Sequence, residues 1–253
     1  MADLLRFRRA WTDVNLADQF QNALVDLLRD STAGSDLLPL VLAQACVKVL
    51  PVSGAGLSLT DELRIPLAAS DADAATAERL QTTLGEGPCL SAVAMDDYLV
   101  ADAAAIATRW PIFGQEFLVQ TPYRSVASLP LRTLDGVRVG ALDLYCVDAR
   151  PIEFHILEEA DLGVATPIAS MLFRQPITDA VHAFTTPAWL ATDSANARMK
   201  VWVAIGMLMA SLGLPNADAL AVLRGYAYSG NRSLDEVAKE LTDRQLKPDQ
   251  LLM

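Results

Sequence analysis

Histidine and cysteine are scarce in this chain, which holds only His155, His182, Cys46, Cys89 and Cys146. The cysteines are odd in number and form no close pair, which argues against a disulfide framework and against a thiolate zinc site. Two histidines leave few participants for metal binding or for Ser/His and Cys/His catalysis. We therefore expect reduced cysteines, no metal site and a protein that is not an enzyme.

Long apolar runs, internal repeats and low-complexity segments are also missing. No uncharged stretch approaches the length of about 18 apolar residues that a membrane helix needs, and the arginines near the N-terminus precede no apolar core of a signal peptide. With 253 residues, of which 52% are hydrophobic, the chain can bury one large core or two ordinary ones. We predict a cytoplasmic globular protein.

Negative charge dominates, but not evenly. The net charge is −11, which ordinarily counts against nucleic acid as a partner. Residues 194–253 hold seven Lys or Arg and six Asp or Glu, a balance of +1, so the preceding 193 residues carry −12. A less acidic end is compatible with a confined site for a polyanion.

The first two thirds of the chain show patterns of both helices and strands. Asp135-Gly136 predicts a hairpin turn, and the strand that returns from it is apolar on both faces except at Asp143, so we expect it to be central. Apolar periodicity and turn residues predict helices at 13–31, 36–50, 72–84, 88–95, 110–120 and 153–173, and strands at 55–60, 65–70, 98–101, 125–133 and 137–147.

Three short amphipathic helices are predicted at the C-terminal end, near 196–212, 216–229 and 233–245. Gly213 followed by Pro215 ends the first helix. Ser233 and Glu236 have the spacing of a capping box at the start of the third. Helices of this length are marginal alone in water, so we expect them to pack into a bundle.

The N-terminal part resembles a GAF domain at Leu84–Leu90, at Ser128–Leu131 and at Gly140–Leu144. The resemblance covers residues 16–175 and implies an α+β fold, with an antiparallel sheet flanked by helices. It also implies a pocket for a small ligand, whose identity is unknown, and no other cofactor.

Six residues with polar or aromatic side chains are candidates for the pocket that the resemblance implies. Cys89 is expected near a helix N-terminus, where a thiol can become reactive, although a lone cysteine is more often a small buried hydrophobe. Each of the others can equally belong to the core or the surface. The set is Cys89, Tyr98, Trp110, Phe113, Tyr123 and Asp143.

The C-terminal part resembles an ANTAR domain, the RNA-binding module of bacterial antitermination regulators. The matching residues are Ala204, Gly206, Leu208, Met209, Leu212, Gly213, Ala219, Leu223, Arg224, Ala227, Arg232–Leu234 and Val237–Ala238. The resemblance implies residues 196–253 as the RNA-binding domain, residues 176–195 as a linker or connecting helix, and a homodimer that binds paired RNA hairpins.

Recognition of RNA loops needs cations for the phosphates and polar or aromatic groups for splayed bases. Four cations of the tail and two further side chains can meet these needs, with a solvated helix face as the alternative for each. The predicted RNA-binding residues are Arg198, Arg224, Arg232, Lys239, Tyr226 and Ser233.

Three functions remain open from the sequence. The first is a signal-responsive antitermination regulator. The second is a ligand-binding or dimerisation protein with a vestigial RNA module, because Ile205 stands where the ANTAR family usually has a lysine that would contact phosphate. The third is a methionine sulfoxide reductase of the GAF type, although the cysteines show no attacking and resolving pair.

Overall fold

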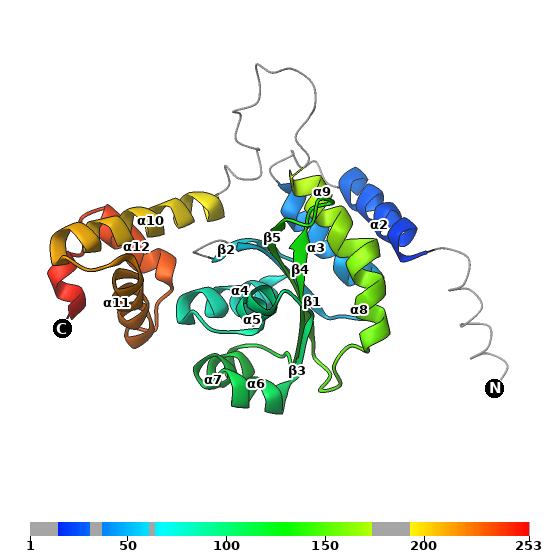
Figure 1. The fold of residues 1–253 in the computed structure, drawn as a ribbon, viewed down its shortest axis with the longest axis horizontal. Helices are drawn as coiled ribbons and strands as arrows, with labels where there is room; N and C mark the ends of the chain where they lie inside the picture. The colour runs from blue at the N-terminus through cyan, green and yellow to red at the C-terminus, as the bar shows by residue number, and fades with distance from the viewer. Residues whose placement is uncertain (1–14, 31–36, 61–63, 174–192, 253) are drawn as a thin grey trace, which may run out of the picture.

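The computed structural model describes residues 15–30, 37–60, 64–173 and 193–252, and for residues 193–198 it describes the backbone alone. The predicted linker at 176–195 falls mostly outside these residues. Within them the chain forms an α+β part with one antiparallel sheet and then a small helical bundle (Figure 1). This confirms the expected fold class.

The sheet has five strands, in the spatial order β2-β1-β5-β4-β3, and every neighbouring pair is antiparallel. The Asp135-Gly136 turn joins β4 to the central strand β5, and Leu129 pairs with Leu142 across them. The strands are β1 (Gly54–Thr60), β2 (Arg64–Ala69), β3 (Leu99–Asp102), β4 (Ser125–Arg132) and β5 (Arg138–Cys146).

One face of the sheet is covered by helices from both ends of the α+β part (Figure 1). These are α2 (Leu16–Asp30), α3 (Leu38–Val49), α8 (Phe154–Ala160) and α9 (Thr166–Phe173). A π-helical turn, η2 (Asp161–Ala165), separates α8 from α9. The single helix predicted at 153–173 is thus interrupted directly before Pro167, which has no amide hydrogen to donate within a regular helix.

The other face carries α4 (Ala72–Leu84), α5 (Pro88–Met95), α6 (Ala103–Arg109) and α7 (Pro111–Gln120). The sequence patterns did not predict α6, which is a short, alanine-rich helix with little amphipathic contrast. Asp102 caps it by accepting a hydrogen bond from the amide of Ala105 at 2.8 Å. Phe113, Phe117 and Ile106 fill the apolar layer under these helices.

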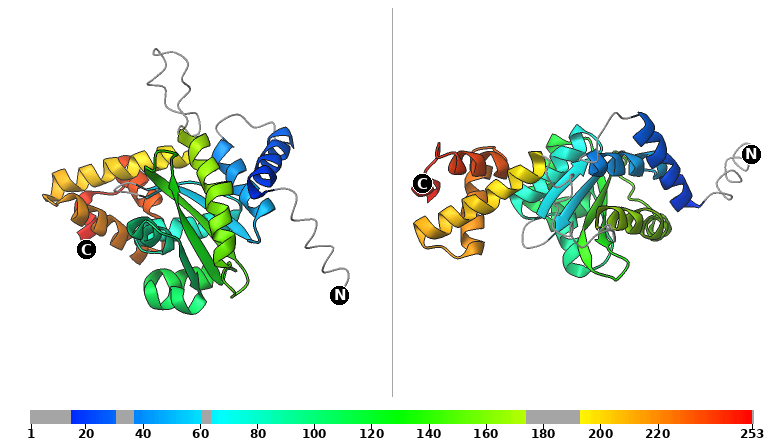
Figure 2. Two further views of the ribbon diagram at one scale, coloured as in Figure 1. Left: turned by 45° about the vertical axis from the view of Figure 1, so that its right-hand side comes forward. Right: turned by 90° about the horizontal axis from the view of Figure 1, so that it is seen from above.

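The C-terminal bundle consists of α10 (Asp193–Leu212), α11 (Asn216–Ser229) and α12 (Leu234–Thr242), followed by the 3₁₀ turn η4 (Pro248–Leu252). It has its own core, to which α10 contributes Ala204 and Leu208 and α11 contributes Leu223. The predicted end of α12 at 245 is wrong, because Asp243 ends the helix and Arg244 has a positive φ of 58°. Figure 2 shows the bundle beside the α4–α5 side of the sheet.

The packing of the central hairpin predicts that two of its leucines contribute very differently to the stability of the fold. Leu129 is fully buried, whereas Leu134 is 82% exposed in the connecting turn. We expect Leu129→Ala to lower the free energy of unfolding by about 2–5 kcal/mol, because it removes buried methyl groups and leaves a cavity. Leu134→Ala should change it by less than about 0.5 kcal/mol. Chemical denaturation of both variants measures this, and equal effects would contradict the packing described.

Candidate functional site

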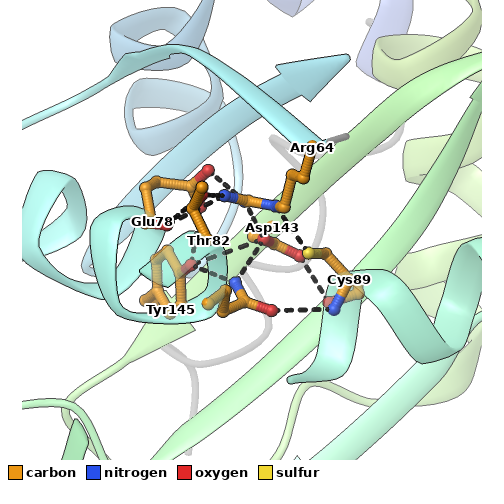
Figure 3. Close-up of polar contacts among 8 residues, drawn as sticks. Arg64, Glu78, Thr82, Cys89, Asp143 and Tyr145 are labelled. Atoms are coloured by element: carbon orange, nitrogen blue, oxygen red, sulfur yellow. Dashed lines mark hydrogen bonds and ion pairs between the residues drawn. The ribbon is translucent and has the colours of Figure 1, made fainter. Parts of the chain in front are cut away.

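A buried guanidinium lies between α4 and the sheet (Figure 3). Arg64, the first residue of β2, donates from Nε to Cys89 Sγ at 2.7 Å and from Nη1 to the Glu78 carbonyl oxygen at 2.9 Å. It also donates to Thr82 Oγ1 at 3.0 Å and to Asp143 Oδ2 at 3.1 Å, and it forms an ion pair with the Glu78 carboxylate. One arginine thus joins β2, α4, α5 and β5.

Two uncharged side chains complete this polar cluster. Gln81 donates from Nε2 to Asp143 Oδ2 at 2.8 Å and to the Tyr145 hydroxyl at 3.1 Å, and its Oε1 accepts from the Cys89 amide at 2.9 Å. Tyr145 in turn donates to Glu78 Oε1 at 2.7 Å. The charges therefore sit in a connected network of hydrogen bonds, the condition under which buried charges are tolerated. We call these residues, with Arg64 and Thr82, the Arg64 cluster.

The local sequence explains how the Arg64 cluster assembles. Alternation along β5 directs Asp143 and Tyr145 to the same face, and helical spacing along α4 places Glu78 and Gln81 opposite them. Gly56 is required on the neighbouring strand, since a Cβ there would lie 2.0 Å from Glu78 Oε1. The glycine leaves the space that the carboxylate occupies.

Burial sets the proton affinity of the Arg64 cluster. It raises the pKa of Glu78 to about 7, with the negative charge of Asp143 adding to the effect and Arg64 opposing it. Burial also raises the pKa of the Cys89 thiol, against the opposing influence of Arg64. Cys89 does stand in the first turn of α5, but there it is a buried, protonated hydrogen-bond partner rather than a reactive thiolate.

The structure brings some of the predicted pocket residues together. Cys89 and Asp143 both belong to the Arg64 cluster. Tyr123 lies next to it, with its ring stacked on that of Tyr145 at 5.0 Å between centroids. Phe113 is fully buried in the apolar layer on the same face.

Trp110 is buried in the same apolar layer as Phe113 and Tyr123. Its indole donates from Nε1 to Ser91 Oγ at 3.1 Å. Tyr98 lies apart from this group. Tyr98 donates its hydroxyl to Asp161 Oδ2 at 2.8 Å and packs with the helices on the opposite face of the sheet. Arg64, the centre of the cluster, was missed, because an arginine beside a turn is normally solvent-exposed.

Arg198 lies on α10, and the other five predicted RNA-binding residues lie on α11, α12 and the turn between them. Arg232 is placed 5.6 Å from the centroid of the Tyr226 ring and forms an ion pair with Glu240 at 3.0 Å. Ser233 caps α12 by accepting from the Glu236 amide at 3.2 Å, and the Glu236 carboxylate accepts from the Ser233 amide at 2.7 Å. The predicted capping box is confirmed.

The remaining cations differ in exposure. Lys239 is exposed on α12. Arg224 is only half-exposed, and burial lowers its pKa. The Arg198 side chain lies outside the described residues.

A cleft of about 400 Å³ separates this surface from the α+β part. It is lined from one side by α4 and α7 and from the other by the α11–α12 turn, and the residues on it are mostly polar. The polar residues that line it include Arg79, Thr83, Glu116, Arg232, Ser233 and Glu236.

Within the described residues, no single helix is long and apolar enough to cross a membrane. Met199–Leu212 and Asn216–Ser229 reach that length and apolar composition only together, and they are bent by 109° to each other.

Comparison with known proteins finds a domain match over most of the helical bundle. Residues 191–241 match the ANTAR domain family, which confirms the resemblance seen in the sequence. No curated protein sequence matched the chain.

Solved structures resemble the α+β part. The GAF domain of a phosphoenolpyruvate-protein phosphotransferase from Coxiella burnetii is 13% identical, with 61% of this chain and 92% of that chain covered and a TM-score of 0.42. The corresponding GAF domain from Acinetobacter is 11% identical, with coverage of 64% and 97% and a TM-score of 0.45. The chain thus combines an α+β part that is similar to solved GAF domains with a segment, residues 191–241, that matches the ANTAR domain. We call the first the GAF-like part.

The raised pKa of Glu78 predicts a specific pH dependence of stability. In the folded chain the Glu78 carboxyl group keeps its proton up to about pH 7, whereas the ordinary pKa of a glutamate is 4.5. The folded state therefore binds more protons between these values, and the Glu78 contribution to stability falls as pH rises through that window. In Glu78→Gln this contribution is absent. The free energy of unfolding of the variant, relative to the wild type, should rise by on the order of 3 kcal/mol from pH 4.5 to above 7.

Urea denaturation of both proteins at pH 5.5, 6.5 and 8 measures this difference. Other titrating groups cancel in the comparison as long as the substitution leaves their environment unchanged. A difference that stays constant across the three pH values would show that Glu78 titrates normally in the folded protein.

Proposed function

We propose that this protein is a signal-responsive RNA-binding regulator of transcription antitermination. The observation that carries the proposal is the ANTAR match over residues 191–241, which falls on an independently packed three-helix bundle. The bundle binds paired RNA hairpins as a homodimer, and the GAF-like part controls that binding in response to a small molecule.

The surface chemistry of the bundle supports RNA as the partner. Arg232 and Tyr226 form a cation–aromatic pair in which the ring face and the guanidinium can both stack on an unpaired base. Lys239, which lies more than one turn after the start of α12, is exposed and can form an ion pair with a phosphate.

The Arg64 cluster supports a sensory role for the GAF-like part. Replacing buried ion pairs by apolar residues is often neutral or stabilising, so stability alone does not account for this cluster. A small anionic or hydrogen-bonding molecule that competes for Arg64 would redistribute its contacts with Glu78 and Asp143. Such a molecule would change how α4 is held against the sheet.

A second candidate is a ligand-binding or dimerisation protein whose bundle has lost RNA binding. The absence of lysine at Ile205 favours it. Ile205 is 2% exposed and belongs to the core of the bundle, so the side chain at this position packs inward in this chain. Ile205 thus contributes to the packing of α10. Whether the bundle binds RNA then depends on its exposed lysine and arginine side chains.

The positions of the thiols give no support to a reductase. Cys46 and Cys146 belong to the core on one face of the sheet, whereas Cys89 faces α4 on the other. All three are buried. The arrangement places neither of the other thiols next to Cys89, where a resolving cysteine would have to stand.

If the bundle binds RNA, the effect of removing one positive charge on RNA affinity should depend on where that charge lies on the protein. Lys239→Gln should weaken binding to an RNA with two adjacent hairpins several-fold and reduce the slope of log K against log salt by about one, because one phosphate contact is lost. Lys48→Gln changes the net charge equally at an exposed site on α3 and should leave both quantities unchanged. Fluorescence anisotropy in a salt series measures them, with a scrambled RNA of equal length as the reference.

Two results would count against the proposal. Equal affinity for the hairpin RNA and the scrambled RNA at low salt would favour the second candidate. Equal effects of Lys239→Gln and Lys48→Gln would show that any binding reflects overall charge rather than the α12 surface.

A further inference from the structure

The face of the bundle that carries predicted RNA-binding residues packs on the last turn of α4. Arg224 on α11 lies against Gly85, the residue that ends α4, so closely that a Cβ at Gly85 would be 2.4 Å from Arg224 Nη1. Gly85 has a φ of +72°, which glycine adopts without strain. The glycine thus both ends the helix and provides the surface on which the arginine rests.

The start of α12 meets the same turn of α4. The Leu234 amide donates to Thr83 Oγ1 at 3.4 Å, and Leu234 is fully buried. Next to this contact, the cleft brings Arg79 of α4 opposite Arg232 and Ser233. Arg224 near the middle of α11 and Leu234 at the start of α12 therefore both contact the last turn of α4.

Within the part of the chain that the structure describes, the contact with α4 leaves one hydrogen-bond donor of Arg224 without an acceptor. Its Nε is buried without a hydrogen-bond partner among the described residues. A buried donor that lacks a partner costs free energy compared with the same donor in water. An RNA phosphate would provide the acceptor that α4 does not, so RNA can compete for this arginine.

We propose that the last turn of α4 is an autoinhibitory latch, which covers Arg224 and the N-terminus of α12 and must release them before RNA binds. The proposal rests on the RNA-binding function proposed above and adds the surface that controls it. In the closed state the latch lowers the apparent RNA affinity by the fraction of molecules that are open.

The position of α4 connects this latch to the Arg64 cluster. Glu78, Gln81 and Thr82 point into the cluster, whereas Thr83 and Gly85, directly after them, contact the bundle. A helix is held rigidly by its hydrogen bonds, so a shift of its inner face moves its last turn as well. Changes in the cluster can thereby alter the closed population, provided the ligand binds the two states with different affinity.

A side chain at position 85 tests the latch in the full-length chain. Asparagine tolerates positive φ better than other non-glycine residues, so Gly85→Asn keeps the end of α4 while displacing Arg224. We expect at least tenfold tighter binding to the two-hairpin RNA. Gly136→Asn is the matched control, because Gly136 has a φ of +83° and nothing lies within 4 Å of the position that a Cβ would take there; its affinity should equal that of the wild type.

A gentler pair of variants covers the case in which Gly85→Asn fails to fold. Thr83→Val removes the acceptor of the Leu234 amide with little change in volume and should tighten RNA binding about threefold. Thr108→Val is the control, because Thr108 is exposed on α6 and its hydroxyl donates only to the Ala104 carbonyl of that helix; it should have no effect. Circular dichroism confirms that each variant is folded.

The possible outcomes separate the latch from the function on which it rests. Tighter binding by the latch variants alone supports both proposals. If the wild type binds the hairpin RNA and folded latch variants bind it with unchanged affinity, the latch is wrong and the RNA-binding function stands. If neither the wild type nor any variant prefers the hairpin RNA to the scrambled one, both are wrong.

Discussion

The buried guanidinium of Arg64 is the interaction on which the architecture of the GAF-like part depends. It lies at the first residue of an edge strand, yet its hydrogen bonds reach α4, α5 and the central strand β5. Removing one partner of a buried ion pair leaves an uncompensated charge, which destabilises a protein far more than the pair stabilises it. Arg64, Glu78 and Asp143 therefore constrain one another, and Gly56 is constrained in turn by the space that Glu78 needs.

Helix α4 carries the consequence of this constraint to the bundle. Its inner face is fixed by the Arg64 cluster, and its last turn meets Arg224 and the start of α12. The same helix thus belongs both to the interior of the GAF-like part and to the contact between the two parts. The proposed control of RNA binding needs no separate relay, because α4 is shared by the two sites.

Much of the fold could be predicted from the sequence, because its signals are local. Alternation along β4 and β5, the Asp135-Gly136 turn and the capping box at Ser233 each depend on residues within a few positions of one another. The three helices of the bundle could be predicted equally well, since glycine and proline mark their ends. The short helix α6 was missed because its alanine-rich sequence has no apolar stripe to detect.

The Arg64 cluster could be predicted only in part, because its members are distant in sequence. Asp143 stood out as the charge within the apolar stretch of its strand, and Cys89 through its place at a helix start. Arg64 and Glu78 looked like ordinary surface residues, and only the sheet register and the position of α4 bring them together. The contact between Arg224 and Gly85 could not be predicted from the sequence for the same reason, since it joins two parts of the chain that have separate cores.

Hydrogen exchange of the full-length protein, with and without the two-hairpin RNA, tests the central claim most directly. The Leu234 amide and the amides at the end of α4 are protected in the closed arrangement by the contact between the two parts. The account predicts that saturating RNA increases exchange at the last turn of α4 while the central strand β5 is unchanged. Unchanged or slower exchange at that turn in the RNA-bound protein would contradict it.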